Sequence, residues 1–238
     1  YSAFLTMRSI EQIKVDVAYS ETNVKVIGIS GGLSYGPLGM SHHSLQDIAT
    51  IRAIPNIRVF LPADRFETEK LIDILIEEEG PAYVRVGRNP VPEVHSSSDF
   101  EFEIGKALTI SEGNDLTIIG CGKMVKTAQK AGKLLEKEGI NARVLSMPTL
   151  KPLDEKAILK AAVETGGIIT LEEHSIYGGL GAAVTQVVAE KRPVPVKIMG
   201  IPDEPAVAGK PEEVFSHYGL TAENVVKKSE NLVQEVSE

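Results

Sequence analysis

Short apolar runs alternate with helical patterns along this chain, and the alternation limits its fold more than any other feature. Runs bounded by Gly, Pro, Asn or Asp, as buried strands usually are, lie at 24–29, 57–61, 82–86, 115–119, 142–146, 167–171 and 195–199. We expect helices in the gaps, at 4–18, 44–53, 64–79, 123–138, 154–165, 178–190 and 221–235. The pattern predicts an α/β fold with two α/β domains, whose parallel or mostly parallel sheets are flanked by helices.

A stretch rich in proline and serine divides this pattern in two. Residues 89–99 read Asn-Pro-Val-Pro-Glu-Val-His-Ser-Ser-Ser-Asp, a composition typical of linkers. We therefore expect a first domain at 1–92, a linker at 93–104 and a second domain at 105–238. Because a helical pattern starts at Tyr1 without an initiator Met or a preceding strand, we expect the first domain to be incomplete at its N-terminus.

Composition narrows the classes of partner and compartment. The formal charge of −8 and the pI near 5.3 argue against nucleic acid or an anionic membrane as the main partner, because the field of the protein would repel both. A single cysteine, Cys121, excludes an internal disulfide and favours a reducing compartment. The apolar runs are far shorter than a membrane span, and no secretory signal pattern opens the chain. We expect a cytoplasmic protein.

Two further segments resemble functional motifs only weakly. Gly120-Cys-Gly-Lys-Met-Val125 follows a strand and opens a helix, but Val125 replaces the third glycine of a dinucleotide-binding loop. An ordinary strand-to-helix turn is the better interpretation. His174 is a lone histidine at a strand end, and such a residue more often fixes a loop or an interface than catalyses a reaction. We found no convincing zinc-site spacing among the His, Cys and acidic residues, so we expect no metal site in this chain.

The strongest candidate for a functional site is the long glycine-rich loop at 30–42, which ends in His42, the first of two adjacent histidines. Ligands of open parallel sheets bind beyond the carboxyl ends of the strands, and this loop follows a strand directly. It is longer than a simple connection needs, which favours a function. Neutral imidazoles of His42 and His43 could donate to or accept from hydroxyl groups. From the residues alone, they could equally well only close the loop.

Several segments resemble the transketolase family. Gly39-x-x-His42 followed by Leu45-x-Asp-Ile-Ala-x-x-Arg-x-Ile-Pro-Asn56, then Pro62-Ala-Asp64, Glu67 and Gly80-Pro-Ala-Tyr-Val-Arg-Val-Gly-Arg88, is similar to its pyrimidine-binding domain. Residues 105–238 resemble its C-terminal domain, through the stretches at 144–154, 172–181 and 219–222. The resemblance covers essentially the whole chain and is closest to the separately encoded C-terminal subunits of split transketolases.

The resemblance implies transfer of a two-carbon ketol unit from a ketose or its phosphate to an aldose or its phosphate, with thiamine diphosphate as cofactor. By motif match, Phe4, Met7 and Ile10 line the aminopyrimidine of the cofactor. The match implies that His42 hydrogen-bonds substrate hydroxyls and assists proton transfer. Arg88 matches an arginine that holds the acceptor's phosphate, a task suited to a planar guanidinium.

Two positions depart from the family pattern. Ser30 stands where the family has a second substrate-binding histidine, and Leu38 stands where it has an aspartate. Both positions normally contact sugar hydroxyls. We therefore expect substrates other than xylulose 5-phosphate to be competitive, with the cofactor chemistry retained.

The resemblance also implies partners. The family's activating glutamate precedes the position of Tyr1, and its diphosphate and its Mg²⁺ or Ca²⁺ are held by another domain. We expect a partner subunit that carries these parts, pairing of this chain as a homodimer, and no activity of this chain alone. Three alternatives remain: an enzyme like 1-deoxy-D-xylulose-5-phosphate synthase, a 2-oxo-acid dehydrogenase β-subunit, and a non-catalytic dimerisation scaffold.

Overall fold

Two sheets form the frame of the structure, a computed structural model that describes residues 1–237. The first sheet has the strand order β1-β3-β2-β7, with β1 (Lys25–Gly28), β2 (Arg58–Phe60), β3 (Ala82–Arg85) and β7 (Thr149–Lys151). The second has the order β4-β6-β5-β8-β9, with β4 (Leu108–Ser111), β5 (Leu116–Gly120), β6 (Ala142–Ser146), β8 (Ile168–Ser175) and β9 (Val196–Ile201). Neighbouring strands are parallel except β7 against β2 and β4 against β6. The predicted α/β fold with mostly parallel sheets is confirmed.

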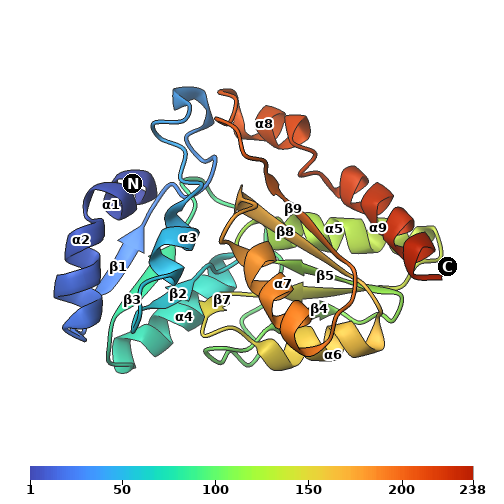
Figure 1. Ribbon diagram of the computed structural model, residues 1–238, viewed down its shortest axis with the longest axis horizontal. Helices are drawn as coiled ribbons and strands as arrows, with labels where there is room; N and C mark the ends of the chain where they lie inside the picture. The colour runs from blue at the N-terminus through green and yellow to red at the C-terminus, as the bar shows by residue number, and fades with distance from the viewer. Residues whose placement is uncertain (238) are drawn as a thin grey trace.

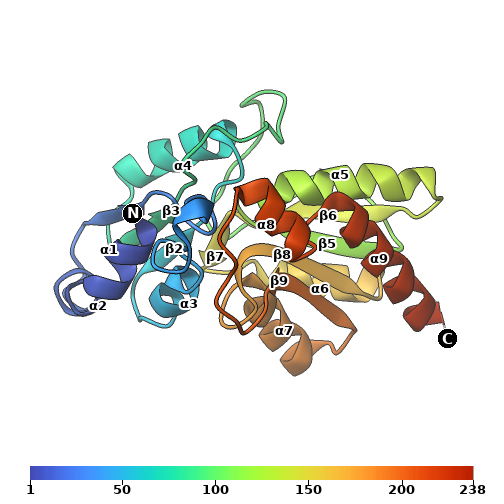
Figure 2. The ribbon, with the colours of Figure 1, turned by 90° about the horizontal axis from the view of Figure 1, so that it is seen from above.

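Helices cover both faces of each sheet, as Figures 1 and 2 show. Around the first sheet lie α1 (Ser2–Arg8), α2 (Ile10–Gln12), the π-helix η1 (Ile13–Tyr19), α3 (Asp47–Arg52) and α4 (Arg65–Glu77). The second carries α5 (Met124–Lys137), α6 (Glu155–Glu164), α7 (Leu180–Lys191), α8 (Pro211–His217) and α9 (Ala222–Ser237). Within residues 1–237, none of the helices combines the length and the apolar character needed to cross a bilayer.

One hydrophobic core continues from the first half of the chain (residues 1–92) into the second half (residues 105–238). Ile48 of α3 and Val59 of β2 belong to the same buried cluster as Ile119 of β5, Ile158 of α6 and Val184 of α7. Strand β7 strengthens the connection, because it follows β6 in the chain but pairs with β2 of the first sheet. The two halves therefore share an interior and a sheet edge.

Some elements differ from the sequence prediction. The single helix expected at 4–18 is three successive segments, because the backbone of Ser9 (φ −104°, ψ 22°) leaves the helical region and residues after Ile13 form wide π-turns. Strand β7 has only three residues, too few for a periodic signal. Helix α8 was missed although Pro211 at its first position, followed by two glutamates, is a recognisable start.

The segment predicted as a linker, 93–104, has no regular helix or strand but is packed against the fold. A carboxylate oxygen of Asp64, Oδ2, accepts the backbone N–H groups of Val94 (2.8 Å) and His95 (2.9 Å). Its other oxygen caps α4 by accepting the N–H of Glu67, and the buried Glu67 accepts the hydroxyl of Ser146 on β6. The capping residues of α4 thus also fasten this segment and the second sheet.

Candidate active site

The loop between β1 and α3 rises from the carboxyl end of β1 and carries the short 3₁₀-helix η2 (Gly36–Leu38). Its base is closed by two backbone hydrogen bonds, Gly32 N–H to Ser44 O (3.1 Å) and Ser44 N–H to Gly32 O (2.8 Å). Figure 1 shows its tip beside the segment that leads into α8, where Gly209 N–H donates to Gly36 O (3.2 Å). The loop of the first half is therefore held by the second half.

Aromatic rings from α1 and from this loop form a cluster around His42. The imidazole of His42 lies edge-on to Phe4, with ring centroids 5.0 Å apart, and tilted against Tyr35 at 5.7 Å. Tyr1 packs on both Phe4 and Tyr35, and its hydroxyl lies 3.1 Å from the hydroxyl of Tyr35. Ser41 Oγ lies 3.0 Å from Nδ1 of His42. The half-buried imidazole thus has fixed neighbours and a polar partner on Nδ1.

Arg88 extends this cluster to the surface. Its guanidinium carbon lies 4.1 Å above the ring of Tyr35, a cation–π contact. Arg88 also lines a hollow of about 210 Å³, together with Lys123, Lys126 and Lys130 of the second half. The carboxylate of Glu212 lines it too, and Lys123 is paired with Glu173 (2.7 Å), but the cations outnumber the acids, which favours an anion there.

The other residues singled out from the sequence have different surroundings. Met7 is exposed, whereas Ile10 packs against the hydrophobic core and does not share the position of Phe4. Ser30 is buried at the base of the loop, and its hydroxyl has no hydrogen-bond partner among the described residues. His43 is buried and its Nε2 contacts Gly36 O (3.0 Å), so that it closes the loop. Leu38 is half exposed at the tip of the loop.

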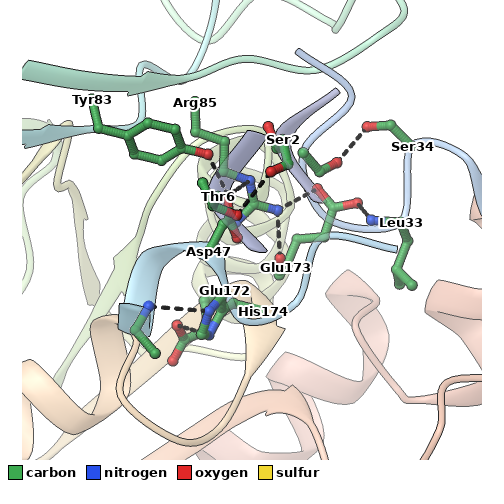
Figure 3. A network of polar contacts seen from close by, with 12 residues as sticks. Ser2, Thr6, Leu33, Ser34, Asp47, Tyr83, Arg85, Glu172, Glu173 and His174 are labelled. Atoms are coloured by element: carbon green, nitrogen blue, oxygen red, sulfur yellow. Dashed lines mark hydrogen bonds and ion pairs between the residues drawn. The ribbon is translucent and has the colours of Figure 1, made fainter. Parts of the chain in front are cut away.

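A buried network of charges lies beneath the loop (Figure 3). Arg85 of β3 forms ion pairs with Asp47 of α3 (3.5 Å) and with Glu173 of β8 (3.9 Å), and it donates to the carbonyl of Glu173 (2.7 Å). Tyr83 donates its hydroxyl to Asp47 (2.7 Å), and Lys123 pairs with Glu173 (2.7 Å). Two acids and two bases balance each other, which makes the burial of these charges tolerable.

This network was missed from the sequence, although one signal was present. Arg85 lies inside the apolar run at 82–86, and a charged residue within a buried strand must find a partner. The partners could not be read from the sequence, because Asp47 and Glu173 are 38 and 88 positions away. Tyr35 was also missed, since nothing in the sequence places its ring between His42 and Arg88.

Glu172 and His174 lie beside the network on β8, and His174 contacts the first half. The carboxylate of Glu172 accepts the N–H groups of Leu180 (2.7 Å) and Gly181 (2.8 Å) at the start of α7, yet burial raises its pKa to about 7. Burial lowers the pKa of His174 to about 4. Its neutral ring donates from Nδ1 to Ser175 O (2.7 Å), and Nε2 faces the N–H of Ala49 on α3 (3.4 Å). His174 thus has the contacts of a residue that fixes a loop.

The glycine-containing turn before α5 has the features of a structural turn. Gly122 has a positive φ of 53° and donates its N–H to Leu61 O (3.1 Å). Cys121 is buried, and burial raises the pKa of its thiol well above the ordinary value. Across the described residues, no three or more His, Cys, Asp or Glu side chains gather in a way that could hold a metal ion.

Family comparisons account for nearly the whole chain. Residues 1–93 match the family model described as transketolase, pyrimidine binding domain, and residues 105–225 match transketolase, C-terminal domain. The chain belongs to the transketolase family. It corresponds to the C-terminal part of these enzymes, as the sequence motifs predicted.

Similar proteins include subunits of split enzymes. The chain is 52% identical to an apulose-4-phosphate transketolase subunit of Phocaeicola vulgatus, over 98% of this chain and 74% of that protein. It is 35% identical to a 6-deoxy-6-sulfo-D-fructose transketolase subunit of Clostridium sp., over 98% of this chain and 72% of that protein. A solved split-gene transketolase, an inactive β4 tetramer, has a TM-score of 0.91 and 39% identity, over 98% of this chain and 75% of that one.

Buried Glu172 and His174 predict how stability depends on pH. The folded pKa of His174, about 4, lies below the ordinary 6.5. Its neutral ring therefore contributes fully to the free energy of unfolding above pH 6.5, and this contribution is lost as the pH falls toward 4. Glu172 acts in the opposite direction, because a folded pKa of about 7 against an ordinary 4.5 makes its ionisation costly as the pH rises between these values. His174→Gln removes the first effect. Relative to wild type, the variant should therefore gain about 2 kcal/mol of unfolding free energy between pH 7 and pH 4.5.

Urea unfolding at both pH values measures this difference. His217→Gln, a change at an exposed histidine of α8, is the matched control and should follow the wild type. Parallel pH curves for His174→Gln and wild type would contradict a buried neutral imidazole.

Proposed function

We propose that this chain is the C-terminal subunit of a thiamine-diphosphate-dependent transketolase that moves a two-carbon ketol unit from a ketose to an aldose in carbohydrate metabolism. The observation that carries the proposal is the cluster of Phe4, Tyr35, His42 and Arg88, which brings three of the family-matched residues to one side of the loop. Family membership and the names of the split relatives support it.

The residues of α1 fit the aminopyrimidine ring of the cofactor. Phe4 offers a half-buried ring held by His42 and by the guanidinium of Arg8 (4.6 Å), and Met7 is exposed beside it on the same helix. Ile10 packs on the core, so its part would be to support this wall from behind. When bound, thiamine diphosphate supplies the carbanion chemistry that breaks and forms the carbon–carbon bond.

The chain's own contribution would be to hold hydroxyl groups and protons beside the reacting carbon. The imidazole of His42 keeps Nδ1 near Ser41 Oγ, which leaves Nε2 for a substrate hydroxyl. The hydroxyl of Ser30 has no partner among the described residues but is shielded from solvent at 1% exposure, so its part in substrate binding would require the base of the loop to move. Both are assigned to substrate binding in this proposal, and His42 also to proton transfer.

The substrate is proposed to carry an anionic group at one end. Arg88, which lies over the ring of Tyr35, lines one hollow with Lys126 and Lys130 of α5 and with Lys123 just before this helix, which suits a phosphate. The names of both relatives contain a sugar with a phosphate or a sulfo group. Because Leu38 and Ser30 replace residues that usually contact sugar hydroxyls, we propose a ketose phosphate other than the usual pentose phosphates.

Assembly completes the proposal. We infer a cytoplasmic enzyme in which a partner subunit binds the diphosphate and its Mg²⁺ or Ca²⁺, while this chain pairs as a homodimer through its second domain. We keep the domain boundaries predicted from the sequence, with a first domain at 1–92, a linker at 93–104 and a second domain at 105–238. Both relatives are named as single subunits of their enzymes, and the solved split-gene protein is an inactive β4 assembly, which supports the need for a partner.

The assembled enzyme should transfer a ketol unit from hydroxypyruvate to an aldose phosphate, and this chain alone should not. Product sugars measured by mass spectrometry, with and without the partner subunit and thiamine diphosphate, test this. Pyruvate in place of hydroxypyruvate separates the alternatives, because turnover of pyruvate would indicate a 1-deoxy-D-xylulose-5-phosphate synthase or a 2-oxo-acid dehydrogenase. Absence of turnover with every donor would favour a dimerisation scaffold.

His42→Ala in the assembled enzyme should lower kcat by about 10² to 10⁴, because a group that assists proton transfer is lost. The matched control is His217→Ala, which removes an exposed histidine of α8 that does not belong to the aromatic cluster. Single-turnover and steady-state rates measure both. Full activity of His42→Ala would remove this residue from the mechanism.

Arg88→Ala should raise the KM for phosphorylated acceptors about 10- to 100-fold and leave unphosphorylated aldehydes nearly unaffected, since a charge-assisted contact to phosphate is lost. Lys133→Ala, which removes a positive charge from α5 outside the hollow, is the control for net charge. Equal effects on both classes of acceptor would indicate that Arg88 has a structural role instead.

A further inference from the structure

The side chain of Glu173 reaches across from the second half and holds the base of the loop that carries His42. Its Oε1 accepts the backbone N–H of Leu33 at 2.6 Å and the ammonium of Lys123 at 2.7 Å. Glu173 is 8% exposed at the wall of a cavity of about 560 Å³ that Arg85 and Lys123 also line, so its carboxylate is largely shielded from water, which strengthens these contacts. Leu33 lies between Ser30 and Tyr35, two residues of the candidate site.

The backbone of the loop lies directly against this carboxylate and against Arg85. A Cβ added at Gly31 would lie 2.1 Å from Nε of Arg85, and one added at Gly32 would lie 2.2 Å from Cδ of Glu173. Gly32 also has a positive φ of 62°, which glycine adopts without strain. The glycines therefore permit a contact that fixes the path of the loop from below.

We propose that Glu173 is a positioning residue of the candidate active site, through which the second half sets the position of Tyr35 and His42. The proposal rests on the proposed function and adds a role for a half that supplies neither Phe4 nor His42. Glu173 does not belong to the aromatic cluster, and it acts through Leu33 and the closed base of the loop. It is thus distinct from a catalytic residue.

Two features should confine the effect of losing the Glu173 carboxylate to the base of the loop. The loop keeps two backbone hydrogen bonds from the second half without it, Gly209 N–H to Gly36 O (3.2 Å) and Ser175 N–H to Leu45 O (3.0 Å). Arg85 also keeps its bond to the carbonyl of residue 173, which a side-chain change leaves in place. Loss of the carboxylate should therefore move the base of the loop without unfolding it.

The test compares Glu173→Ala with Glu173→Gln in the assembled enzyme. Alanine leaves the N–H of Leu33 without an acceptor and Lys123 without its carboxylate. It should lower kcat about 10- to 100-fold with unphosphorylated and phosphorylated acceptors alike, because small displacements of reacting groups are costly. The unphosphorylated acceptor is the decisive substrate, since Lys123, which loses its carboxylate, also lines the anion hollow. Glutamine retains an oxygen for Leu33 and should restore most of kcat. Glu164→Ala, which breaks the pair with Arg143 at the far end of β6 (2.6 Å), is the matched control and should stay near wild type.

A second measurement separates this proposal from the proposed function. The ¹³C and ¹⁵N ring signals of His42 in the full isolated chain should shift in Glu173→Ala and stay unchanged in Glu164→Ala, whether or not the chain takes part in ketol transfer. If the alanine variant does not fold, Glu173→Leu, which fills a similar volume but offers no acceptor to Leu33, takes its place and should shift the His42 signals, whereas Glu173→Gln should leave them close to wild type. An unmoved His42 ring in a folded Glu173→Ala, or kcat within twofold of wild type, would overturn the positioning role. An inactive wild-type assembly would instead remove the proposed function.

Discussion

The buried charge network of Asp47, Arg85, Glu173 and Lys123 is the constraint on which the arrangement of the candidate site depends. Its members come from α3, β3, β8 and the turn before α5, so that it ties together elements of both sheets. Asp47, Arg85 and Glu173 are buried and Lys123 is partly exposed. Burying such charges is costly unless each has a partner, and these groups meet that requirement only when both halves are in place. The network therefore fixes how the two halves meet.

Specificity of geometry is the natural role for such a network, because buried ion pairs add little net stability compared with apolar packing. Stability comes instead from the shared core, in which Ile48, Val59 and Val184 belong to one cluster. The core tolerates small adjustments of packing, whereas an unpaired charge does not. The charge network and the shared core together explain why the loop between β1 and α3 keeps one path over the second half.

Short sequence patterns were sufficient to predict most of the helices and strands. Apolar runs gave the central strands, and Asp64 followed by Glu67 begins α4 with hydrogen bonds that span only a few residues. Family motifs placed Phe4, His42 and Arg88, and the structure brings these residues together around Tyr35. Strand β7 and the break at Ser9 were beyond such signals, because β7 exists through pairing with β2 and the non-helical backbone of Ser9 lies within a continuous helical pattern.

The sequence by itself determined the α/β class, the order of the main strands and helices, and which residues could bear chemistry, because these follow from periodicity and side-chain type along the chain. Only the tertiary structure decided that β7 joins the first sheet, that Ile10 packs on the core while Phe4 meets His42, and that Glu173 holds Leu33. The physical reason is distance along the chain: Glu173 and Leu33 are 140 residues apart. Such a contact leaves no local pattern, since it exists only when two sheets pack and their buried charges find each other.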